Sequence, residues 1–306
     1  MSLFIKNKLF EFIHVETSQK CNLACPMCPR EMLLEKGYLD KSQLSANDFT
    51  KIFNPIINNA GKFFLSGNYS DPMMNTDIES IVEYCLSGKQ SHVQIGSNGS
   101  LRKPDVWYNL GKIMRKHYEK HKRWNSVLFA IDGLEDTNPI YRVNSKWWKI
   151  MENAKAFIDG GGFAEWKYIV FEHNEHQVEE ARELSKQWGF DEFIIKKTSR
   201  NFESGVHKVS KEVMTPDGLQ TITYEAPRDI SYQAESVQNS IVTDIPIDCY
   251  SKKRGTFYIS CESKLYPCCV IGKQGYRNTH IRQEKDKIYD YINYDITIDP
   301  ITNKFN

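Results

Sequence analysis

Short apolar runs alternate with amphipathic helical stretches from residue 12 to residue 200. The expected strands are Phe12–Glu16, Lys62–Leu65, His92–Gly96, Ser126–Ile131, Trp166–Phe171 and Glu192–Lys196. The expected helices are Ala46–Asn58, Asp77–Ser87, Val106–Tyr118, Trp147–Asp159 and His176–Trp188. Repeated strand–helix units predict a parallel sheet with right-handed crossovers, which curls. We therefore expect an α/β fold whose strands end at one shared edge, where such folds place their chemistry.

The composition is that of an ordinary globular protein, with 40% hydrophobic and 26% charged residues among 306. A net charge of +1 argues against nucleic acid as a partner, although a local basic patch for tRNA stays open. The apolar runs are too short to cross a bilayer, and the first residues lack a signal-peptide pattern. Eight cysteines in such a chain fit a reducing compartment, where metal binding is commoner than disulfides. We expect a cytoplasmic protein without membrane contacts.

Three cysteines, Cys21, Cys25 and Cys28, lie in the loop after the first expected strand. Three thiolates can hold three corners of a [4Fe–4S] cluster, which leaves the fourth iron open to another ligand. The last two alone would also fit a redox pair or half of a zinc site. A redox pair has no use for Cys21, and a zinc site needs a fourth ligand, for which His14 is the only nearby candidate.

This C-x3-C-x2-C spacing resembles that of the radical S-adenosylmethionine (SAM) superfamily. The resemblance implies a partial (βα)6 barrel, open on one side, with a [4Fe–4S] cluster whose open iron is chelated by SAM. It also implies an electron donor such as flavodoxin or ferredoxin, and reductive cleavage of SAM to a 5′-deoxyadenosyl radical that abstracts hydrogen from a substrate.

Two loops match SAM-binding motifs of the superfamily in part. The family sequence Gly-Gly-Glu-Pro, which binds the SAM amino group, is replaced here by a loop that supplies Gly67, Asn68 and Asp71. Carbonyl and carboxylate oxygens can still accept hydrogen bonds from an ammonium group. Ser97 and Asn98 stand in a Ser-Asn-Gly sequence that resembles the family's Thr-Asn-Gly, which approaches the SAM ribose and methionine.

Three further residues are site candidates by their place in the family pattern. Asp132 ends the fourth strand and is expected to face the radical or the substrate as a catalytic residue, or else to cap the next helix. Arg142 matches an arginine that pairs with the SAM carboxylate, a role that suits a planar guanidinium; the alternative is a surface arginine. Asn174, after the fifth strand, is a candidate contact of adenine or ribose, or a solvated loop residue.

A second set of cysteines, Cys249, Cys261, Cys268 and Cys269, surrounds a strand–turn–strand pattern. The set resembles the SPASM or twitch extension of radical SAM enzymes, which implies a second, auxiliary [4Fe–4S] cluster. The later C-x2-C pair of that extension is missing, and adjacent cysteines rarely bind one cluster, so His280 or a substrate atom could supply the fourth ligand. A zinc knuckle is the alternative. The eighth cysteine, Cys85, lies in a helical pattern and is expected to pack in the core.

The expected organisation is a radical SAM barrel over residues 1–200, a bridging segment with a hairpin over 201–246, and a small twitch or SPASM-like iron–sulfur domain over 247–306. An Asp-Gly turn supports the hairpin. The implied function is an oxidoreductase that acts on a peptide or protein. Radical SAM dehydrogenation or rearrangement of a small molecule or nucleotide is the alternative, and a zinc-binding module for RNA or protein is the alternative of another class. The sequence does not indicate the bond altered, whether SAM is consumed, or the oligomeric state.

Overall fold

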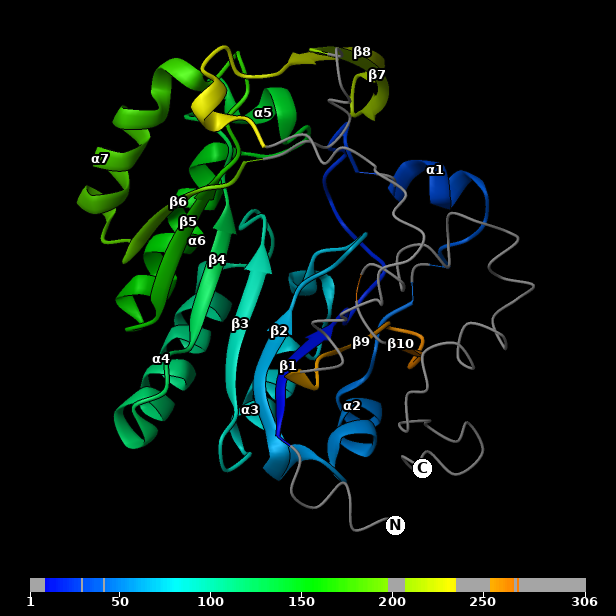
Figure 1. Ribbon diagram of the computed structural model, residues 1–306, viewed down its shortest axis with the longest axis vertical. Coiled ribbons are helices and arrows are strands. Elements are labelled where there is room, and N and C mark those ends of the chain that lie inside the picture. The colour runs from blue at the N-terminus through cyan, green and yellow to red at the C-terminus, as the bar shows by residue number, and fades with distance from the viewer. Residues whose placement is uncertain are drawn as a thin grey trace, which may run out of the picture.

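The computed structural model describes residues 9–28, 30–40, 42–197, 207–234, 254–266 and 269 (Figure 1). Its main feature is an eight-stranded sheet of order β10-β9-β1-β2-β3-β4-β5-β6, in which only β10 runs antiparallel to its neighbour. The strands are β1 (Phe10–Val15), β2 (Ala60–Leu65), β3 (His92–Ser97), β4 (Ser126–Ala130), β5 (Phe163–Tyr168), β6 (Glu192–Ile195), β9 (Phe257–Ile259) and β10 (Leu265–Tyr266). The prediction of a largely parallel α/β fold with six successive βα strands is confirmed, and a partial barrel fits this order.

Most of the helices pack against the outer face of this sheet (Figure 1). The helices are α1 (Arg30–Glu35), α2 (Ala46–Phe53), α3 (Ile78–Leu86), α4 (Pro104–His121), α5 (Asn138–Tyr141), α6 (Trp147–Asp159) and α7 (Val178–Trp188), with 3-10 turns at Ile57–Asn59, Pro72–Met74, Glu175–Gln177 and Ile230–Tyr232. Aromatic side chains fill the layer between sheet and helices: Trp107 of α4 packs on Phe129 of β4, with ring centroids 5.2 Å apart. Cys85 is fully buried in α3, as expected.

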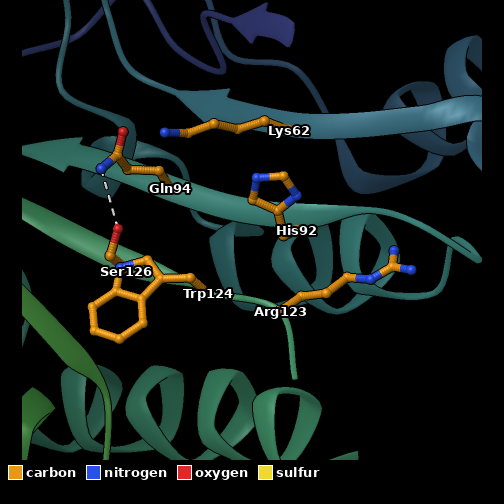
Figure 2. A pocket seen from close by; sticks show the side chains of 6 residues that line it. All are labelled: Lys62, His92, Gln94, Arg123, Trp124 and Ser126. Atoms are coloured by element: carbon orange, nitrogen blue, oxygen red, sulfur yellow. Dashed lines mark hydrogen bonds between the residues drawn. The ribbon is translucent and has the colours of Figure 1, made fainter. Parts of the chain in front are cut away.

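A polar layer fills the inner face at the amino ends of the strands, far from the cysteine loop. Figure 2 shows Gln94 reaching toward Ser126, and the Gln94 amide donates to Ser126 Oγ (3.1 Å) and to the Glu165 carboxylate (2.9 Å). Lys62 extends over Gln94 in the same view. A cavity of about 210 Å³ lies here, lined in part by these side chains. The inner face of the sheet thus carries a separate polar cluster near the amino ends of the strands, at the opposite end from the cysteines.

The fifth strand begins and ends three residues earlier than expected, so the prediction of Trp166–Phe171 is wrong at both ends. The Ile169 amide donates to the Asp132 carboxylate (2.7 Å), and the Phe171 amide donates to the Asn174 side-chain oxygen (2.7 Å). These amides bond to side chains instead of to a neighbouring strand. The apolar run beyond Tyr168 is therefore a loop packed under other residues.

Two strands of the later sequence form the expected hairpin. They are β7 (Lys208–Thr215) and β8 (Gly218–Glu225), joined at the Asp-Gly turn. The hairpin lies beyond the carboxyl ends of the barrel strands, at the top of Figure 1. Its inner face packs on the loops there: Tyr224 contacts the rings of Tyr141 and Phe171, and Val213 belongs to a small cluster with Ala24.

The strand–turn–strand expected around Cys261 is present as β9 and β10. Its place was not expected: β9 pairs in parallel with β1, so that His14 lies opposite Tyr258. Within the described ranges, no helix is both long and apolar enough to cross a membrane.

Candidate active site

The three cysteines of the first set line a single cavity. Cys21, Cys25 and Cys28 are half-buried, and the loop that carries them is held by Ala24, whose amide donates to the Val143 carbonyl (3.2 Å). The cavity has a volume of about 280 Å³. Its walls come from the carboxyl ends of β1 to β6 and the loops that follow them. The loop thus brings three thiols to the edge where a parallel α/β fold places its chemistry.

Most of the residues predicted for SAM binding line the same cavity. They are Gly67, Asn68, Asp71, Ser97, Asn98 and Arg142. Two predicted residues, Asp132 and Asn174, are absent from the described cavity wall and are fully buried behind it.

Burial suppresses ionisation of two of the thiols, Cys25 and Cys21. It raises the pKa of Cys25 to about 11, and the nearby Arg142 guanidinium, whose Nη1 lies 3.9 Å from the sulfur, is the main opposing influence. Burial also raises the pKa of Cys21, with Asp71 adding to the effect. Ligation by metal requires thiolates, so a cation bound among these sulfurs would supply the missing stabilisation. Within the described ranges, no three His, Cys, Asp or Glu side chains are arranged around one metal ion. A [4Fe–4S] cluster requires its three thiolates to lie further apart than the ligands of a single ion, because each thiolate binds a different iron.

Asp71 ties the two predicted SAM loops together. Its carboxylate accepts from the Asn98 amide (2.7 Å), from Ser97 Oγ (2.9 Å) and from the Met73 amide (2.9 Å). The side chain is 3% exposed, and burial raises the pKa of this carboxyl, opposed by those hydrogen bonds. Its expected role toward the SAM ammonium stays a prediction, and what it does here is to fix both loops.

Gly67 allows the loop before Asp71 to fold back on itself. A Cβ atom at this position would lie 2.2 Å from Ser70 Oγ and 2.3 Å from the Ser70 carbonyl oxygen. Both contacts are far inside van der Waals separation, and one of them is with rigid backbone. Gly67 is therefore required by a close approach within the loop itself, at the wall of the cavity.

Asn98 connects the third strand to the cysteine loop. Its side-chain nitrogen, Nδ2, donates to the side-chain oxygen of Asn22 (3.0 Å) and lies 3.9 Å from Cys21 Sγ. Its oxygen accepts from the Ser100 amide (2.9 Å), so the side chain is held from both ends. This arrangement fixes the cysteine loop against β3.

Arg142 forms a buried ion pair with Asp132. Its Nε donates to the carboxylate at 2.6 Å, and the second carboxylate oxygen accepts from the Ile169 amide. Burial works against the charge on Arg142, but attraction to Asp132 outweighs it and raises the pKa of the guanidinium above its ordinary value. Arg142 is thus a positioned cation in the cavity wall and not a surface arginine.

Asn174 holds the turn after β5. Its amide nitrogen donates to the carbonyls of Asp132 (2.9 Å) and Ile169 (3.0 Å), and its oxygen accepts from Phe171. The side chain is thereby committed to backbone groups. Its predicted contact with adenine or ribose stays a prediction that these bonds do not support.

Several cavity residues were not anticipated from the sequence. Lys167 and Lys196 line the wall on the β5–β6 side, and Arg30 lines it beside the cysteines. The signal for Lys167 was available, because it alternates with the buried Trp166 and Tyr168 and so points to the opposite face. Behind the wall, the buried carboxylate of Glu16 was also missed; an acid at the end of an apolar strand was its only signal.

Two members of the second cysteine set lie in the described part of the chain, and one of them contacts a residue of the cavity wall. Cys261 occupies the β9–β10 turn, and its sulfur lies 3.3 Å from Ser42 Oγ. The carbonyl of Cys269 accepts from the Asn68 side chain (3.3 Å). Cys249, Cys268 and His280 fall outside the described residues. The auxiliary cluster therefore stays a prediction.

Comparison with known proteins bears on the fold. The sequence matches no family model and no curated protein. Among solved structures, Streptococcus suis SuiB bound to S-adenosylmethionine matches 85% of this chain and 60% of its own, with a TM-score of 0.52 and 12% identity. SuiB bound to the precursor peptide SuiA matches 61% of this chain and 39% of its own (TM-score 0.44, 16% identity), and anSMEcpe with bound AdoMet matches 62% and 53% (0.47, 15%).

The likeness identifies the fold alone. These neighbours are radical SAM enzymes, and the chain shares the α/β architecture of SuiB. The match covers 60% of the SuiB chain and 53% of the anSMEcpe chain, so this chain spans less than two thirds of the length of either.

Proposed function

We propose that this chain, which has the fold of radical SAM enzymes, is itself one, and that Cys21, Cys25 and Cys28 hold its [4Fe–4S] cluster. The observation that carries the proposal is the meeting of three thiols, two polar loops and a positioned arginine in one cavity at the carboxyl ends of the strands. The donor set fits the group, because soft thiolates are the preferred ligands of iron–sulfur clusters.

When bound together, the cluster and SAM supply reductive cleavage of the sulfonium and a 5′-deoxyadenosyl radical that abstracts hydrogen from carbon. The protein's part is to position and to shield. Arg142, held by Asp132, offers a guanidinium for the SAM carboxylate, and oxygens around Asn68 and Asp71 accept from its ammonium group. The hairpin β7–β8 covers the cysteine loop through Tyr224 and Val213, which limits access of water and oxygen to the thiols.

We extend the proposal to the second cysteine set, which would hold an auxiliary cluster as in twitch or SPASM extensions. The hydrogen bond from the side chain of Asn68, a residue of the cavity wall, to the Cys269 carbonyl supports it. Such a cluster could anchor substrate or accept the electron that an oxidation releases, which makes the enzyme an oxidoreductase. A flavodoxin or ferredoxin would supply the first electron.

The proposed substrate is a peptide or protein, with a small molecule or nucleotide as the alternative. In either case the wall on the β5–β6 side offers two lysines, Lys167 in β5 and Lys196 directly after β6. Ammonium groups at a cavity wall favour a substrate that presents a carboxylate or a phosphate there.

Anaerobic reconstitution with iron and sulfide tests the proposal. The reduced protein is expected to form 5′-deoxyadenosine from SAM, and Cys21→Ala, Cys25→Ala and Cys28→Ala are each expected to abolish this activity, because the cluster needs all three thiolates. Cys85→Ala is the matched control, since Cys85 lies buried in α3, and it should leave the activity in place. A colourless protein with stoichiometric zinc, or full activity in any of the three variants, would overturn the proposal.

A further inference from the structure

Glu16 is a buried acid with no part in the proposed chemistry. It follows β1 directly, is 3% exposed, and is absent from the cavity wall. Burial raises the pKa of its carboxyl, and the largest opposing influence is a hydrogen bond from the Tyr258 hydroxyl. A buried carboxylate is costly unless donors surround it, so the donors at this site indicate what the residue is for.

The donors come from two segments distant in sequence. One carboxylate oxygen accepts from the Tyr69 amide (2.9 Å) and from Ser70 Oγ (2.9 Å), and the Asn68 amide also donates to the group. These three residues belong to the loop that lines the cavity. The other oxygen accepts from Tyr258 of β9, in the hairpin that carries Cys261.

The hairpin and Cys269, which lies just beyond it, make further contacts with segments near the cysteine loop and with the loop at Asn68. Gln19, two residues before the first cysteine, donates to Glu262 (3.1 Å). Ser42 contacts Cys261, and Asn68 donates to the Cys269 carbonyl, as described above. The second cysteine segment is therefore bonded both to the approach of the cysteine loop and to the loop at Asn68, and Glu16 is the buried junction between hairpin and loop.

We propose that Glu16 is a positioning residue through which Tyr258 of the second-cysteine hairpin sets the conformation of the Asn68–Ser70 loop and thereby the affinity for SAM. The inference rests on the proposed function. Glu16 acts through the loop and touches neither cofactor nor substrate. Because one carboxylate serves both segments, a change in the hairpin alters the loop, and SAM bound at the loop stabilises the hairpin to the same degree.

The test is SAM affinity of the anaerobic, cluster-loaded protein carrying Tyr258→Phe, measured by titration calorimetry. The substitution removes one hydroxyl and keeps the ring that packs on His14. We expect the dissociation constant to rise about fivefold or more, the low end of measured couplings between sites. Tyr84→Phe is the matched control, because the Tyr84 hydroxyl also donates a single hydrogen bond, to the Thr50 carbonyl far from the cavity. The SAM affinity of this variant should equal that of the wild type.

A spectroscopic readout separates positioning from loss of fold. In Tyr258→Phe the iron content and the electron paramagnetic resonance signal of the reduced cluster without SAM should match the wild type, while the change that SAM induces in that signal should require more SAM. Glu16→Gln, which keeps one oxygen for the loop, should also lower the affinity for SAM. The double variant Glu16→Gln/Tyr258→Phe should bind SAM no more weakly than the weaker-binding of the two single variants. Wild-type affinity in Tyr258→Phe, or strictly additive losses, would overturn the inference. A wild type that binds no SAM would instead refute the proposed function.

Discussion

Arg142 shows how a single side chain in this site is prepared for its role. Its guanidinium lies in the cavity wall, yet its Nε is bonded to Asp132, which is completely buried and bonded in turn to the Ile169 amide. A flexible side chain is thereby fixed before any ligand arrives, which lowers the entropy lost on binding. In this structure Asp132 positions Arg142, and its predicted role at the reacting atoms stays a prediction.

Replacement of Asp132 by Asn tests this view. Asparagine keeps an oxygen for the Ile169 amide, but it removes the charge that holds Arg142. Loss of a charge-assisted hydrogen bond costs about 1.5–3 kcal/mol, so SAM affinity should fall roughly ten- to a hundredfold. Arg142→Lys should lower the affinity for SAM by a similar factor, because lysine lacks the bidentate fork of the guanidinium group. The measurement is titration calorimetry on the anaerobic protein.

The exposed Asp136, four residues further on, gives the control. Its carboxylate accepts from the Gln177 side chain outside the cavity, and Asp136→Asn should bind SAM as the wild type does. Unchanged affinity in Asp132→Asn would show that the pair is structural only.

At the level of elements, the hairpin β7–β8 is placed to protect the cysteine loop. Tyr224 is buried in a cluster with Met27, Tyr141 and Phe171, against which Cys25 packs. The opposite face of the hairpin is exposed, and Met214 there is 59% exposed. One face of a two-stranded ribbon is therefore bound to the loops and the other is free of them, which allows the two to be tested separately.

Tyr224→Ala should open this cover. Truncation of a buried aromatic residue costs about 3–5 kcal/mol where the site does not collapse, and here the loss falls on the contact between hairpin and cysteine loop. The reconstituted cluster should bleach several times faster in air than in the wild type, as followed by visible absorbance. Met214→Ala, on the exposed face of the same hairpin, should bleach at the wild-type rate. Equal rates in all three proteins would contradict a covering role.

The elements that could be predicted from the sequence are those determined by residues adjacent in sequence. Strands such as His92–Gly96 and the hairpin at the Asp-Gly turn follow from alternation and turn chemistry, which are properties of adjacent residues. The loop after β5 could not be predicted in this way, because its apolar residues are of the same kind as those of a strand. What makes it a loop is the carboxylate of Asp132, distant in sequence, which accepts the hydrogen bond of the Ile169 amide that a neighbouring strand would otherwise accept. The pairing of β9 with β1 is equally non-local.

The candidate site divides in the same way. The cysteines, Gly67 and Asn98 stand in short motifs just after strand ends, and the topology of a parallel sheet brings strand ends together. Glu16 and Lys167 stand in no motif. Their roles depend on which face each side chain occupies and on what a remote segment places opposite, and the sequence pattern alone does not specify the remote segment.

For the molecule as a whole, the two cysteine sets should make separate contributions to metal content. Two cubanes need about eight irons, four for each set. Cys249→Ala combined with Cys261→Ala should reduce the iron content to about half, and the remaining cluster should still cleave SAM. Iron and acid-labile sulfide assays on the anaerobic protein measure this. A wild-type content near four would remove the auxiliary cluster from the proposal.

The parallel pairing of β9 with β1 also orders the biosynthesis of the protein. Tyr258 meets Glu16 across 242 residues of sequence, so the edge of β1 is already outside the ribosome long before its partner strand has been translated. An unpaired strand edge invites association with other chains, and contacts of such long range form slowly. The nascent barrel therefore passes through a period in which the acid beneath its cavity lacks one donor and its first strand is unprotected.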